Sequence, residues 1–182
     1  MNSLEESAQD VVAALWGQSA RVSPRLIGKY KINVAECSTR LDNTASKISE
    51  LKLWIDDSSS LTVEKLRAKL TAIIAVHPVH CVIVDYIQLM DCPNIPPENE
   101  YAQVTYISKR LKQMARDFGV VLIACSQLSR KIESAYERVT LNALRASGQL
   151  EQDGDLIFGL WRQGKEGAPQ YINIDGLDHE LI

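Results

Sequence analysis

This sequence of 182 residues lacks any long hydrophobic run, and it has few glycines and prolines. No apolar stretch approaches the roughly 18 residues that cross a bilayer, and the first residues do not show the basic-then-apolar order of a signal peptide. With only 9 Gly and 6 Pro beside 46% hydrophobic and 24% charged residues, collagen-like and disordered chains are also excluded. We therefore expect one globular domain in the cytoplasm, without a membrane segment.

Cysteine pairs and an excess of positive charge are also missing. The formal net charge is −3, so no basic field over the whole molecule would attract nucleic acid, and any such binding must be local. The four cysteines include no Cys-x-x-Cys pair, which favours reduced thiols without a metal: Cys37, Cys81, Cys92 and Cys125. Basic residues gather in two segments that we interpret as solvated helix faces: Lys109, Arg110, Lys112 and Arg116, and Arg130, Lys131, Arg138 and Arg145.

Helical and strand-like segments alternate along the chain, which is typical of an α/β domain with a parallel sheet. Helices are predicted at residues 5–22, 42–50, 63–73 and 98–118, and strands at 51–55, 81–84, 120–125, 155–161 and 170–174. Thr62 is the expected N-cap of the third helix, and Gly119 is the expected C-cap of the fourth. Both helices have an apolar face at helical spacing: Val63, Leu66, Leu70 and Ile73 in one, and Val104, Ile107, Leu111, Met114, Ala115 and Phe118 in the other.

Two of the strand-like runs are apolar throughout, as buried parallel strands require, and both end in polar residues. The run 81–84 is followed by Asp85, and the run 120–125 is followed by Ser126 and Gln127. In open α/β sheets, ligands bind at the carboxyl ends of the strands. A functional site is therefore expected at this edge of the sheet.

The apolar run that ends in Asp85 has the form of a Walker B element, in which a carboxylate at the strand tip holds the Mg²⁺ of a nucleoside triphosphate through water. Taken alone, the same pattern also fits an aspartate that caps a turn. Gln127 at the neighbouring strand tip favours the nucleotide interpretation, because an amide there could hydrogen-bond a γ-phosphate or its attacking water.

Other kinds of site are only weakly indicated. His77 and His80 lie close together, but His179 is the only other histidine and no cysteine stands at ligand spacing, so a surface turn is favoured over a metal site. The sequence has no Gly-x-Ser-x-Gly elbow, which argues against a hydrolytic triad.

Four segments, taken together and in this order, resemble the RecA-like C-terminal motor domain of DnaB-type replicative DNA helicases. They are residues 54–62 (WIDDSSSLT), 83–90 (IVDYIQLM), 126–130 (SQLSR) and 144–157 (LRASGQLEQDGDLI). The resemblance implies an α/β fold, namely a RecA-like three-layer domain with a mostly parallel central sheet, incomplete at its N-terminal end. Residues 1–182 would form a single partial domain. The resemblance also implies ATP and Mg²⁺ as cofactors, and ATP-driven translocation on single-stranded DNA with duplex unwinding in DNA replication by a ring hexamer.

The resemblance further implies roles for single residues. Asp85 corresponds to the Walker B carboxylate that holds Mg²⁺ through water, and Gln127 to the glutamine that couples the triphosphate to the DNA loops. Glu5 corresponds to the general base that polarises the attacking water, with a plain surface carboxylate as the alternative. Arg145 and Gly148 correspond to a loop that holds the phosphate backbone of single-stranded DNA through a guanidinium and an accessible backbone N–H.

The chain also departs from the family pattern. Ala143 and Ala146 stand where the family has acidic residues, which removes polar partners that would order the DNA loop. Residues 163–167 (QGKEG) do not supply the arginine finger, and no Gly-x-x-x-x-Gly-Lys-Ser/Thr phosphate loop occurs in the sequence. We therefore expect an interior piece of a helicase domain that is inactive alone. A non-catalytic remnant serving as an interaction or assembly module is the alternative, and a RecA-type ATPase of recombination or clock type is a third.

Overall fold

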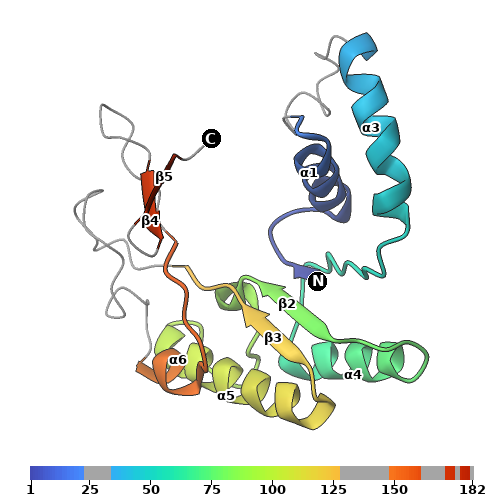
Figure 1. Cartoon of the computed structure of the whole chain (residues 1–182). Coiled ribbons are helices and arrows are strands. Elements are labelled where there is room, and N and C mark those ends of the chain that lie inside the picture. Colours follow the sequence, from blue (N-terminus) through green and yellow to red (C-terminus); the bar gives the residue numbers. More distant parts are fainter. Residues whose placement is uncertain (23–33, 128–147, 161–170, 175–176, 181–182) are drawn as a thin grey trace.

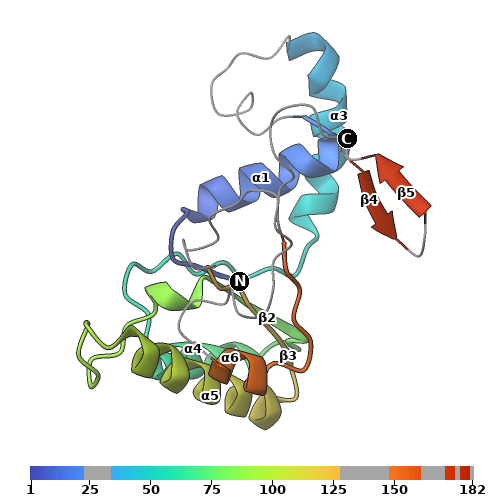
Figure 2. The same ribbon diagram turned by 90° about the vertical axis from the view of Figure 1, so that its left-hand side faces the viewer.

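A three-stranded parallel sheet lies between two groups of helices (Figure 1). The structure is a computed structural model, and it describes residues 1–22, 34–127, 148–160, 171–174 and 177–180. The sheet consists of β1 (Asn2–Ser3), β2 (Cys81–Asp85) and β3 (Val121–Ala124), in that order. Figures 1 and 2 show two groups of helices on its two sides, α1 (Ala8–Ala20) with α3 (Val34–Ser49), and α4 (Val63–Ile74) with α5 (Glu100–Phe118) and α6 (Gly148–Asp153). None of the described helices has the length and apolar character needed to cross a membrane.

The first strand, β1, contains only two residues, yet the chain holds it on both sides. On one side β1 runs parallel to β2, with Ser3 opposite Asp85. On the other side the N–H of Ser3 donates to the carbonyl of Asp56 at 2.9 Å, and the N–H of Asp56 donates to the carbonyl of Met1 at 2.9 Å. The strand predicted at 51–55 is therefore wrong. The chain makes only an isolated bridge at Asp56, because β1 is too short to support a longer ladder.

Helices α4 and α5 cover one face of the sheet and form the core with it. Val82 and Val84, which alternate with outward-facing residues along β2, are buried on this face. Burial of this apolar surface stabilises the fold by about 25 cal/mol for each Å² removed from water. The core comprises Leu61, Val63, Leu66, Leu70, Val82, Val84, Ile87, Met90, Cys92, Val104, Ile107, Leu111, Met114 and Val120.

The third strand, β3, is more exposed than the sequence predicts. It pairs with β2 from Val121 to Ala124, two residues shorter than the predicted run 120–125. Val121 is 63% exposed and Ile123 is 47% exposed, so the prediction of a buried strand is wrong on this face. These two residues alternate with Leu122, which packs against the core, so β3 is better buried on the face that carries Leu122.

The two helices predicted to begin after Thr62 and to end at Gly119 are confirmed. The N-cap of α4 is Thr62, whose hydroxyl accepts the N–H of Lys65 at 3.2 Å. Helix α5 ends at Gly119, which has a φ of 64°, a conformation that glycine adopts without the steric cost of a Cβ. Asn99 caps the beginning of α5, because its side chain accepts the N–H of Ala102 at 3.1 Å.

The helices on the other side of the sheet differ more from their predicted bounds. Helix α1 begins at Ala8 rather than at residue 5, because the Ser7 hydroxyl accepts the N–H of Asp10 and caps the helix there. Helix α3 begins at Val34, well before the predicted start at residue 42. The indole N–H of Trp16 in α1 donates to the carbonyl of Leu41 in α3 at 2.9 Å, so a long-range contact supports the early part of α3.

The C-terminal segments give one correction and one confirmation. Of the strand predicted at 155–161, the structure describes residues 155–160, and there the prediction is wrong. This segment pairs with no strand and exposes most of its apolar side chains, with Phe158 81% exposed. The strand predicted at 170–174 is confirmed as β4 (Tyr171–Ile174), and it pairs antiparallel with β5 (Leu177–Glu180), which the sequence analysis missed.

Candidate active site at the carboxyl edge of the sheet

Three of the predicted site residues lie at the same edge of the sheet. Glu5 follows β1 by two residues, Asp85 ends β2, and Gln127 follows β3 by three residues. The three strands are neighbours and run parallel, so their carboxyl ends meet at this edge. The N–H of Leu4 donates to the carbonyl of Asp85 at 2.9 Å, which places the backbone next to Glu5 directly against the tip of β2.

The loop that carries Glu5 is fixed by hydrogen bonds on both sides. The hydroxyl of Ser3, which is buried, donates to the carbonyl of Glu6 at 2.8 Å and accepts the N–H of Glu6 at 3.1 Å. The carboxylate of Asp57 accepts the N–H of Ala8 at 2.9 Å, at the beginning of α1. The backbone is therefore held while the Glu5 side chain remains exposed, so that it can meet a water or ligand at the edge.

Asp85 is half-buried and lies next to a thiol. Burial raises the pKa of the Cys125 thiol, and the negative charge of Asp85 together with a hydrogen bond to its carboxylate raises this pKa further. The thiol therefore stays protonated and can donate to the carboxylate. Mg²⁺ in nucleotide sites is bound through one or two carboxylates, with waters and phosphates completing the shell. The half-buried Asp85 can supply the one carboxylate that such a site needs. In the described residues no group of three or more His, Cys, Asp or Glu could hold a metal ion alone.

Gln88 is a residue of this edge whose position the sequence analysis missed. It belongs to the short helix η1 (Ile87–Leu89), directly after β2. Its amide nitrogen donates to the Ser126 hydroxyl at 2.9 Å and to the Gln127 carbonyl at 3.3 Å, and its amide oxygen accepts the N–H of Gln127 at 3.3 Å. Gln88 thus fixes the backbone of Gln127, whose own side chain is exposed. Its place three residues after a strand-tip aspartate was visible in the sequence, but its partners lie 38 and 39 positions away along the chain.

Only part of the predicted DNA loop falls within the described residues. Gly148 is the exposed first residue of α6, and a Cβ built at Gly148 would meet no atom of the described residues within 4 Å, so their packing does not require glycine there. The remaining predicted features of this loop and of the arginine-finger segment lie outside the described residues: Arg130, Lys131, Arg138, Ala143, Arg145, Ala146 and 163–167.

The basic residues of α5 lie on its surface, as the sequence analysis predicts, and several of them have partners. Lys109, Arg110 and Arg116 are exposed. The guanidinium of Arg110 lies 5.4 Å from the ring centroid of Tyr106, and Lys112 forms an ion pair with Asp155. These contacts favour a solvated helix face over a dedicated nucleic-acid surface.

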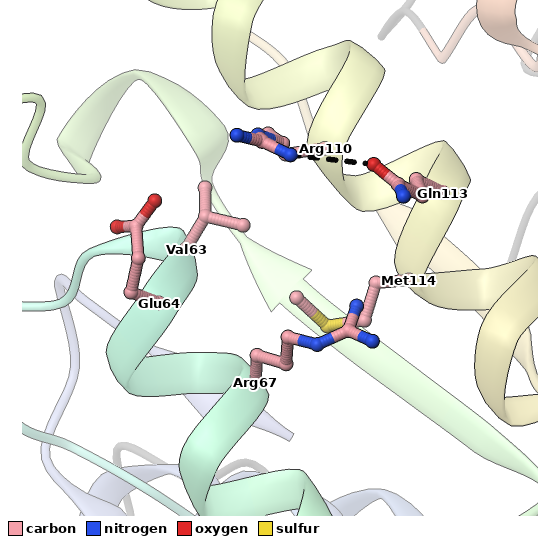
Figure 3. A pocket seen from close by; sticks show the side chains of 6 residues that line it. All are labelled: Val63, Glu64, Arg67, Arg110, Gln113 and Met114. Atoms are coloured by element: carbon pink, nitrogen blue, oxygen red, sulfur yellow. Dashed lines mark hydrogen bonds between the residues drawn. The ribbon is translucent and has the colours of Figure 1, made fainter.

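A hollow of about 200 Å³ lies between α4 and α5, away from the candidate site (Figure 3). Two charged residues that line this hollow already have partners within the chain. A hydrogen bond of 2.6 Å from the Tyr106 hydroxyl holds the pKa of Glu64 below its ordinary value, and Arg67 pairs with Asp117 at 2.7 Å. We therefore attribute this hollow to helix packing. Its lining residues are Val63, Glu64, Arg67, Arg110, Gln113 and Met114.

A parallel sheet that carries carboxylates at two adjacent strand tips and an amide at the third, with helices on both sides, defines the class of RecA-like ATPase domains. Comparison with known proteins agrees with this class. Residues 1–175 match the family described as DnaB-like helicase C terminal domain, and the chain belongs to that family. The resemblance and the RecA-like fold stated from the sequence are thus confirmed.

Curated relatives cover nearly the whole chain. A probable replicative DNA helicase from Trieres chinensis is 31% identical over 182 residues, and the replicative DNA helicase DnaB of Geobacillus stearothermophilus is 30% identical over 181 residues. Each alignment covers 99% of this chain but 38% of the relative. The chain therefore spans well under half the length of these relatives.

Solved structures give the same result. A structure described as an ATPase domain aligns with a TM-score of 0.77 at 32% identity, and the alignment covers 85% of this chain and 55% of that one. A DnaB-like replicative helicase, solved in a study of its interactions with primase, aligns with a TM-score of 0.76 at 32% identity, over 85% of this chain and 38% of that one. These neighbours do not favour the alternative of a non-catalytic module.

Proposed function

We propose that this chain forms part of the ATP-driven motor of a replicative DNA helicase that acts in the cytoplasm as a ring hexamer. The observation that carries the proposal is the convergence of Glu5, Asp85 and Gln127 at the carboxyl ends of three adjacent parallel strands. The relatives support it, because they are replicative DNA helicases that align with 99% of this chain.

Each of the three residues has a role that suits its position. Asp85 would hold Mg²⁺ through water, and the ion would neutralise charge on the phosphates of ATP. Glu5, on its fixed loop, would accept the proton of the water that attacks the γ-phosphate. The exposed amide of Gln127 would hydrogen-bond the γ-phosphate, with its backbone held in place by Gln88.

Two parts of a complete motor are not encoded in these residues. The sequence contains no phosphate loop of the Gly-x-x-x-x-Gly-Lys-Ser/Thr type, and residues 163–167 do not supply an arginine finger. We propose that ATP is bound and hydrolysed only where a phosphate loop and an arginine finger are supplied together with these residues. Arg145 and Gly148 would then grip single-stranded DNA by its phosphates, without selecting base sequence.

The role of Glu5 can be tested in a graft that supplies the missing parts. Residues 1–162 replace the aligned segment of the Geobacillus stearothermophilus DnaB, so that the relative's own phosphate loop and arginine-finger segment are kept. We expect Glu5→Gln to lower kcat for ATP hydrolysis by about 10²-fold or more, as for loss of a general base, with nucleotide binding nearly unchanged.

Glu6→Gln is the matched control, because Glu6 is the next residue in the same loop and is also exposed. This control should leave hydrolysis unchanged. Equal losses in the two variants, or full activity of Glu5→Gln in an active graft, would remove Glu5 as the base.

A further inference from the structure

The hydrogen-bond ladder between β2 and β3 continues beyond the last paired residues of the two strands. The N–H of Cys125 donates to the carbonyl of Val84 at 2.9 Å, and the N–H of Ile87 donates to the carbonyl of Cys125 at 3.0 Å. At Ile87 the chain leaves the sheet and enters η1. The next contact with the end of β3 is made by a side chain, that of Gln88.

The carboxamide of Gln88 takes the place of a peptide group in this ladder. Its oxygen accepts the N–H of Gln127 at 3.3 Å, and its nitrogen donates to the carbonyl of the same residue at 3.3 Å. The nitrogen also donates to the Ser126 hydroxyl at 2.9 Å. Each of the two bonds to Gln127 is long, but together with the shorter bond to Ser126 they hold the amide at three points.

The position of Gln88 requires an amide in one orientation. If the amide were turned over, its oxygen would face the Gln127 carbonyl and its nitrogen would face the Gln127 N–H, so both bonds would be lost. An ionised glutamate has the same shape but no hydrogen to donate to that carbonyl. The backbone beneath the amide is fixed as well, because the neighbouring residue Ile87 is fully buried and bonds to Cys125.

Gln88 thus connects the two strand tips that carry the proposed nucleotide contacts. It lies three residues after Asp85, which ends β2, and it holds both backbone polar groups of Gln127. The side chain of Gln127 is exposed, so its position depends on the backbone that carries it. ADP has no γ-phosphate. A change in the position of Gln127 would therefore alter the binding of ATP and leave the binding of ADP unaffected.

We propose that Gln88 is a positioning residue that gives the site its preference for ATP over ADP. This inference rests on the proposed function, because it takes Gln127 as the contact with the γ-phosphate. Gln88 itself touches no nucleotide. It acts through the backbone of Gln127, which it fixes relative to Asp85.

The first test measures amide hydrogen exchange at Gln127 by NMR in the 182-residue chain. Gln88→Met keeps the length of the side chain and removes all three hydrogen bonds, and we expect exchange at Gln127 to accelerate about tenfold. Gln103→Met is the matched control. The Gln103 amide also donates to two backbone carbonyls, those of Ile95 and Pro96, both at 3.2 Å, but it lies in α5. This control should leave the exchange of Gln127 unchanged.

The second test measures Kd for Mg²⁺-ADP and for a non-hydrolysable Mg²⁺-ATP analogue in the graft of residues 1–162. We expect Gln88→Met to raise Kd for the analogue about fivefold, to leave Kd for ADP unchanged and to lower kcat about tenfold. Gln127→Ala should show the same selective loss. The double variant should be no weaker than Gln127→Ala alone, because both substitutions remove the same contact. If Gln88→Met does not fold, Gln88→Asn, which withdraws the amide by one methylene, answers the same question.

The outcomes separate this inference from the proposed function. If the unaltered graft binds neither nucleotide, or if Gln127→Ala keeps the preference for the ATP analogue, the γ-phosphate contact fails and this inference fails with it. If Gln127→Ala loses the preference and Gln88→Met keeps it, the proposed function stands and the positioning role is overturned. Equal weakening of ADP and analogue binding in Gln88→Met, or an equal effect of Gln103→Met, would also overturn it.

Discussion

Asp56 connects β1 to its surroundings through its backbone, and it binds Lys69 and Ser58 through its carboxylate. Its backbone bridges β1, and its carboxylate accepts two hydrogen bonds from the Lys69 ammonium, at 2.8 and 2.7 Å, and others from Ser58. Burial acts to raise the pKa of Asp56, but the hydrogen bonds from Lys69 and Ser58 outweigh burial and hold this pKa below its ordinary value. Asp56 is thus bound more tightly as the carboxylate than as the acid.

The lowered pKa of Asp56 predicts an acid-dependent loss of stability. A carboxylate with a folded-state pKa below its unfolded value stabilises the fold at pH values above the unfolded pKa, about 3.9, and this stabilisation is lost as the pH falls through the folded pKa. Replacing Lys69 by Met should therefore lower the free energy of unfolding at pH 7, by less than about 1 kcal/mol because the pair is partly exposed. The difference should disappear below the folded pKa.

Urea unfolding followed by circular dichroism between pH 7 and pH 2.5 measures this effect. Lys65→Met is the control on the same helix, because Lys65 bonds to Ser60 and not to a carboxylate. A loss of stability in Lys69→Met that persists unchanged at pH 2.5 would show that packing of the lysine chain, and not its bond to Asp56, is responsible.

Single residues of the site could be predicted from the sequence only where they directly follow a recognisable strand. Asp85 and Gln127 follow apolar runs, and parallel pairing brings such ends together, so their juxtaposition was predictable. Glu5 required the family resemblance, because a strand of two residues leaves no period to detect. Gln88 could not be assigned, since its hydrogen bonds depend on how η1 turns back towards β3.

At the scale of elements, the N-cap of α4 gives a direct stability prediction. Thr62→Ala removes the hydroxyl that accepts the Lys65 N–H and should destabilise the protein by about 1 kcal/mol. Thr71→Ala is the control in the same helix, because the Thr71 hydroxyl only donates to the Arg67 carbonyl within the helix. The control should be neutral or slightly stabilising, since alanine is the better helix former. Chemical denaturation of both variants measures the difference, and equal losses would contradict the cap assignment.

Elements were predictable where periodicity and end signals agreed. Helices α4 and α5 have both, and their bounds are close to those predicted. The apolar run at 155–160 has the composition of a strand. A strand also needs a neighbouring strand with which to form hydrogen bonds, and composition does not reveal whether one is there. The early part of α3 was not predicted from the sequence, and its contact with Trp16 depends on the tertiary fold.

At the scale of the whole molecule, the sequence predicts that the 182-residue chain alone does not turn over ATP. Without a phosphate loop, the backbone N–H groups and lysine that bind the triphosphate are missing, and Glu5 has no positioned substrate. A coupled assay with Mg²⁺, with and without single-stranded DNA, should give background rates. Magnesium-dependent turnover that Asp85→Ala abolishes would contradict this prediction.

The pairing of β1 has a consequence for how the chain reaches its native form during synthesis. Residues 2–3 leave the ribosome well before their partners, because Asp56 emerges after α1 and α3, and Asp85 only after α4 as well. The hydrogen bonds that place the Glu5 loop therefore wait for long loops to close, which is the slow class of contact in folding. We therefore expect the carboxyl edge of the sheet to be assembled late, after α1, α3 and α4 have been made. An incompletely synthesised chain would then carry Glu5, the proposed base, without Asp85.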